Sequence, residues 1–102
     1  MRTITNPSSG RGAATRRFPS DGQLIVKMMI RSESFRGLCD DLAEAERALA
    51  ATDQMPEAFR RDRRAECQEW VESLTNEIKQ ALRKAKVIHF AEAKQKQKQN
   101  IT

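Results

Sequence analysis

The sequence predicts an all-α protein built on an antiparallel two-helix hairpin, which we expect to assemble into a four-helix bundle. Three observations support this class. After Gly37 the chain has no further glycine, and its only proline there is Pro56. The same stretch is rich in Ala, Glu, Arg, Lys and Leu, which lose little rotamer freedom in a helix. Apolar residues also recur at intervals of three and four, which is typical of one helix face.

The composition describes one small domain with a modest core. Its 102 residues include 13 alanines but only 19 Leu, Ile, Val and Phe, a low share for a well-packed globule. We therefore expect no buried pocket for a small-molecule substrate. No apolar run approaches the roughly 20 residues that cross a bilayer. The two cysteines are too few for a disulfide scaffold.

Both ends of the chain are basic, and we expect both to be disordered. Residues 1–19 contain two prolines, a Ser-Ser-Gly step and four arginines, with no acid. We expect a cytoplasmic protein, although such an Arg-rich, acid-free leader is also typical of a mitochondrial presequence. Residues 92–102 form a polar Lys/Gln tail that should fray into solvent.

The first helix is predicted over about residues 21–51, where apolar positions follow a heptad-like seam. Ser20 and Gln23 fit a capping box at its start. Ser32 offers a second start for a shorter helix, with residues 24–30 as an extended segment. We favour the single long helix, because a lone strand would have no partner here.

The second helix is predicted over about residues 56–90, after a loop at residues 52–55. Pro56 suits the first helical position, where no backbone N–H is needed. Such a short loop makes the two helices antiparallel neighbours. Residues should then lie level when their numbers sum to about 107, which places Phe35 opposite Val71.

Two helices alone bury only one stripe each, so we expect a partner to cover the rest of the apolar face. We predict a homodimer, and a different helical protein is the other candidate partner. The predicted interface consists of Phe35, Leu38, Leu42, Leu49, Phe59, Trp70, Leu74 and Ile78.

No arrangement of residues predicts catalysis, a cofactor or a metal site. The single histidine, His89, lies near a helix C-terminus, where the dipole favours its charged form. The sequence has no CxxC or HxxxH pair. Cys39 and Cys67 are predicted at one level of the hairpin, so a disulfide between them is one interpretation. We favour two free, buried thiols in a reducing compartment.

Basic clusters provide an alternative function, non-specific binding of nucleic acid. The net charge of +5 divides into +4 for residues 1–19, −3 for 20–56, +2 for 57–90 and +2 for 91–102. Cationic ends can hold phosphates without reading base sequence. The candidate residues are Arg11, Arg16, Arg17, Arg60, Arg61, Arg63 and Arg64. For the four arginines between residues 60 and 64, we favour ion pairs with acidic residues of the first helix. These acidic residues are Asp40, Asp41, Glu44 and Glu46.

These observations together favour a non-enzymatic interaction module that self-associates through its apolar face. Nothing in the sequence identifies the process that it serves.

Overall fold

The computed structural model describes the backbone of residues 9–100 and the side chains of residues 9–88. This part of the chain is all-α, as the sequence predicts, and contains no strand. Its elements are α1 (Gly10–Arg17), the 3₁₀ turn η1 (Pro19–Asp21), α2 (Gly22–Arg31), α3 (Glu33–Ala51), the 3₁₀ turn η2 (Thr52–Gln54) and α4 (Glu57–Asn100).

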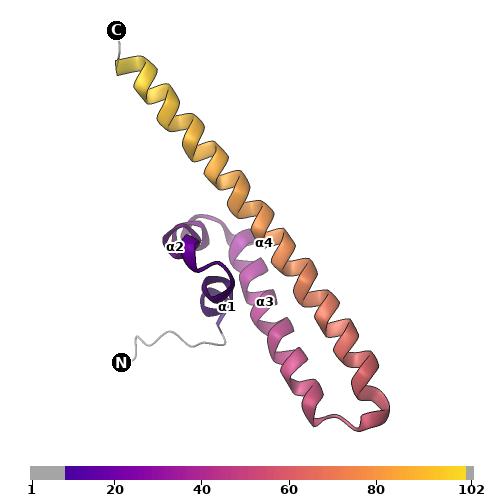
Figure 1. Cartoon of the computed structure of the whole chain (residues 1–102). Helices are drawn as coiled ribbons and strands as arrows, with labels where there is room; N and C mark the ends of the chain where they lie inside the picture. Colours follow the sequence, from indigo (N-terminus) through magenta and orange to yellow (C-terminus); the bar gives the residue numbers. More distant parts are fainter. Residues whose placement is uncertain (1–8, 101–102) are drawn as a thin grey trace, which may run out of the picture.

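Helices α3 and α4 lie side by side and make the most extensive contact in the structure, followed by α1 with α3. In Figure 1, α1 and α2 pack beside α3, and α4 continues well beyond the other helices. An ion pair between Lys86 Nζ and Asp21 Oδ1 at 2.9 Å ties α4 to the start of α2. The four helices therefore form one packed unit with a projecting arm.

The prediction of a single helix over residues 21–51 is wrong, because the helix is interrupted at Ser32. Ser32 has an extended backbone (φ −128°, ψ 114°), and its hydroxyl accepts a hydrogen bond from the N–H of Phe35 at 3.1 Å. The cap satisfies a backbone donor that the break exposes. The alternative start at Ser32 is thus correct, but residues 22–31 form a helix and not an extended segment.

The prediction of a disordered leader over residues 1–19 is wrong for Gly10–Arg17, which form α1. Ser9 caps this helix by accepting a hydrogen bond from the N–H of Gly12 at 3.1 Å. Ala13 and Ala14 are fully buried against the core. Residues 1–8 lie outside the described residues, so that part of the prediction is not addressed.

The predicted end of the last helix near residue 90 is also wrong. The backbone of α4 stays helical to Asn100, through most of the expected Lys/Gln tail. Lys and Gln are good helix formers, and no glycine or proline interrupts this stretch. Residues 101 and 102 lie outside the described part of the chain.

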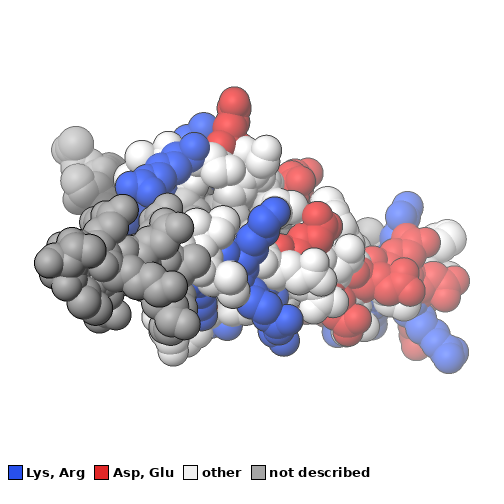
Figure 2. Space-filling model, turned by 90° about the horizontal axis from the view of Figure 1, so that it is seen from above, with Lys and Arg blue, Asp and Glu red and all other residues white. Residues whose placement is uncertain are grey.

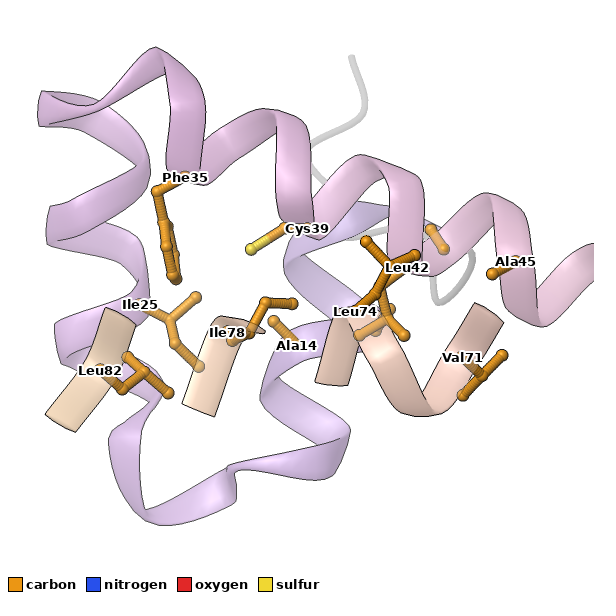
Figure 3. Close-up of a cluster of buried hydrophobic side chains, with 12 residues drawn as sticks. Ala14, Ile25, Phe35, Cys39, Leu42, Ala45, Val71, Leu74, Ile78 and Leu82 are labelled. Carbon is orange, nitrogen blue, oxygen red and sulfur yellow. The ribbon is translucent and has the colours of Figure 1, made fainter. Parts of the chain in front are cut away.

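One hydrophobic core joins all four helices (Figure 3). Small residues of α1 and Ile25 of α2 complete the seam between α3 and α4. The buried side chains are Ala13, Ala14, Ile25, Phe35, Cys39, Leu42, Ala43, Ala45, Val71, Leu74, Ile78 and Leu82. The core is therefore wider than a two-helix seam, and the chain supplies the extra cover itself.

The register between α3 and α4 differs from the prediction. Figure 3 shows Phe35 at the end of the cluster that holds Ile25 and Leu82, whereas Val71 lies near Ala45 at the other end. The predicted pairing of Phe35 with Val71 is therefore wrong. No residue between 53 and 70 is buried, so the core contacts of α4 begin several turns after the connecting turn. A register counted from the loop misses this offset.

Candidate interaction surface

Half of the predicted interface lies inside the chain's own core. Phe35, Leu42, Leu74 and Ile78 are buried, and Ile78 has no exposed surface. Leu38 and Leu49, which also belong to the predicted interface, are half-buried against the same cluster. Helices α1 and α2 therefore cover much of the apolar face for which the sequence predicted a partner.

The two remaining predicted interface residues are exposed on α4. Phe59 keeps 63% of its surface and Trp70 keeps 41%, and Ile88 further along keeps 51%. Trp70 follows Phe59 by 11 residues and Ile88 follows Trp70 by 18. At 3.6 residues per turn these intervals are close to whole turns, so the three side chains lie within about 20° of one direction.

We call this side of the helix the α4 flank. Charged residues separate its apolar ones, and every member except the half-buried Ala81 is exposed. The α4 flank consists of Phe59, Arg63, Glu66, Trp70, Glu77, Ala81, Lys84 and Ile88. The predicted interface includes Phe59 and Trp70 but not Ile88.

Cys39 and Cys67 are both free in the structure, which gives no support to the alternative interpretation of a disulfide between them. Cys39 is fully buried, and Cys67 is half-buried. Burial, with a smaller contribution from the Asp40 carboxylate, raises the pKa of the Cys39 thiol from 9.0 to about 12. Cys39 is therefore a protonated core residue, whereas Cys67 is less buried than the favoured interpretation expected.

Four of the arginines proposed for nucleic-acid binding are paired with carboxylates. Arg16 and Arg17 both contact Glu46, at 2.8 Å and 2.7 Å. Arg63 contacts Glu66 at 3.2 Å, and Arg64 contacts Asp53. The two pairs with Glu46 hold α1 against α3 and lower the cationic character of the α1 surface, whereas the Arg63–Glu66 pair lies within α4.

The favoured explanation of the Arg60–Arg64 cluster is also corrected. Glu46, one of its expected partners, instead receives Arg16 and Arg17 from α1. Arg64 pairs with Asp53 in η2, and Arg60 donates a hydrogen bond to the carbonyl of Met55 at 3.0 Å. Arg60 and Arg64 therefore stabilise the turn that precedes α4.

The charged surface seen from the end of the molecule is mixed. Figure 2 shows basic side chains in separate groups, with acidic and uncharged residues between them. Arg11 and Lys27 line a shallow, open groove between α1 and α2 together with Thr15, Gly22, Gln23 and Val26. The face in this view presents no continuous basic band.

The described residues give no support for a metal site or a membrane-spanning helix. No three His, Cys, Asp or Glu side chains of this part of the chain lie where they could share a metal ion. His89 lies outside the described side chains. Within the same residues, no helix combines the length and apolar content that a membrane span requires.

Comparisons with protein families, curated proteins and solved structures give no match.

Proposed function

We propose that this chain is a non-enzymatic assembly module whose copies associate through the α4 flank. The observation that carries the proposal is the alignment of Phe59, Trp70 and Ile88 on one exposed side of a continuous helix. A single exposed apolar residue needs no explanation, but a row of three large ones on one helix face is typical of a contact surface.

The proposed contact is long and partly polar. Residues 59–88 extend over roughly 44 Å at 1.5 Å per residue. Trp and Phe are among the residues enriched at interfaces, and charged residues such as Arg63 and Glu77 supply both signs along the same side. A second copy presents the same mixture, so the flank can complement itself in a two-fold dimer.

Sedimentation equilibrium of the full chain tests the proposal. We expect the mass to rise from that of one chain toward twice that value with increasing concentration at micromolar levels. Ile88→Ala should shift this transition to higher concentration, because it removes apolar contact from the flank. Val87→Ala is the matched control, since Val87 is also exposed, with 63% of its surface against 51% for Ile88, but lies about 100° around the helix. A mass of one chain at every concentration would contradict the proposal.

Nucleic-acid binding is the alternative function, and fluorescence anisotropy with a generic DNA duplex tests it. We expect no binding at physiological salt, because Arg16 and Arg17 already share Glu46 and the basic side chains lie in separate groups among acidic ones (Figure 2). Binding that is strong at about 50 mM salt and lost by about 200 mM would instead support the alternative.

A further inference from the structure

We propose that two copies pair through the α4 flank in antiparallel orientation, with the two-fold axis at Trp70. This inference rests on the proposed function and adds the geometry of the contact. In such a pair each residue of one α4 faces the residue that lies equally far on the other side of Trp70 in the second copy.

Charge complementarity favours this register. Arg63 and Glu77 lie seven residues before and after Trp70. Each Arg63 therefore faces a Glu77 of the second copy, and the symmetry makes this contact twice. Opposite charges at facing positions also fix the register of paired helices.

Size complementarity favours the same register. Phe59 and Ala81 lie eleven residues before and after Trp70, so the large ring faces a small side chain. The two Trp70 rings meet at the axis, where aromatic pairs gain more than their buried area alone. Ile88 comes level with the turn before α4, where Met55 is half-buried.

The competing arrangements bring like charges together. A parallel pair in register would place Arg63 against Arg63 and Glu77 against Glu77. An antiparallel pair shifted so that Phe59 faces Ile88 would place Arg63 opposite Lys84. Like charges at facing positions are destabilising, so both arrangements are disfavoured.

In the monomer, Arg63 and Glu77 are available for the contacts proposed in the dimer. Arg63 contacts Glu66 within its own helix, but these side chains keep 61% and 67% of their surface. Such an exposed pair contributes little to stability, so exchanging Glu66 for Glu77 of the second copy has a small cost. Glu77 itself is exposed.

The emission of Trp70 provides the first test, because it is the only tryptophan in the chain. Its indole is 41% exposed in the single chain and becomes buried at the proposed axis. We expect its emission to move to shorter wavelength over the concentration range in which the mass doubles.

Charge reversal provides the second test. Arg63→Glu or Glu77→Arg alone creates two repulsive contacts and should raise the dimer Kd by about tenfold or more. The double variant carrying both changes should restore the Kd toward the original value. Arg61→Glu and Glu72→Arg are the matched controls, because both positions are exposed and lie on the opposite side of α4 from Trp70.

The outcomes separate the geometry from the proposed function. Concentration-dependent burial of Trp70, with weakening by each single reversal and recovery in the double variant, supports the antiparallel pair. A dimer whose Trp70 emission does not change with concentration, or in which the double variant does not recover, overturns this geometry and leaves self-association standing. A chain that never associates overturns both.

Discussion

The close contact between α1 and α3 makes Gly10 sensitive to substitution. A Cβ at this position would lie 2.7 Å from the backbone N of Asp40 and 2.8 Å from the carbonyl carbon of Cys39. Neither atom can rotate away, so Gly10→Ala must push α1 off α3. Overpacking of this kind costs about 1–3 kcal/mol. Alanine regains about 0.5–1 kcal/mol through its helix propensity, which leaves a net loss of about 0.5–2 kcal/mol.

Gly37→Ala is the matched control for this experiment. Gly37 also lies in a helix, but nothing stands within 4 Å of its added Cβ. We expect it to stabilise the protein by about 0.5–1 kcal/mol, so the two substitutions should have opposite signs. Urea unfolding followed by circular dichroism measures both free energies of unfolding. Faster modification of the Cys39 thiol in Gly10→Ala would show that α1 has moved. A Gly10→Ala variant that is as stable as the unmodified chain would refute the reasoning.

Three further predictions concern the core and its surroundings. Glu46→Gln removes the common partner of Arg16 and Arg17 and should lower the free energy of unfolding by about 1 kcal/mol. This loss should become smaller at high salt, and urea unfolding at two ionic strengths measures it. The raised pKa of the Cys39 thiol means that only the unfolded chain loses this proton between pH 9 and about 12. The free energy of unfolding should therefore fall with rising pH in that range. For Cys39→Ala it should fall less steeply. Leu42→Ala should cost about 2–5 kcal/mol in thermal or urea unfolding, because Leu42 is fully buried; a loss near zero would contradict the packing of Figure 3.

Periodicity predicted the helical class well because α3 and α4 carry strong local signals. Pro56 and the absence of later glycine defined the beginning of the last helix to within a residue of Glu57. Ser32 carried the signal of an N-cap, but the apolar seam continued on both sides of it, with a single polar gap at Arg31. The apolar seam was misleading because two separate helices contribute to it. Ile25 of α2 and Phe35 of α3 lie on either side of the interruption and both belong to one core.

Helix α1 could not be predicted from amphipathic patterning. Its apolar contribution consists of alanine and glycine, and the segment is otherwise arginine, threonine and turn residues. Close approach to α3 stabilises it instead, together with the ion pairs to Glu46. The available sequence signal was the spacing of Gly10, Ala13 and Ala14, which places three small residues on one helix face.

The contact surface was only partly predictable for a related reason. Trp70 and Phe59 have the size and hydrophobicity of core residues, and only the offset of α4 from the turn leaves them exposed. Sequence patterns within α3 and α4 do not contain this information.

The projecting arm of α4 governs how the molecule diffuses. The radius of gyration is 17.7 Å, and the principal extents are 70 × 35 × 21 Å. A compact chain of about 100 residues would have a radius of gyration near 13 Å. Hydrodynamic friction on such an elongated particle is greater than on a sphere of equal mass. A single copy should therefore leave a gel-filtration column ahead of globular standards of its own mass, and a rotational correlation time interpreted for a sphere would likewise report a heavier particle.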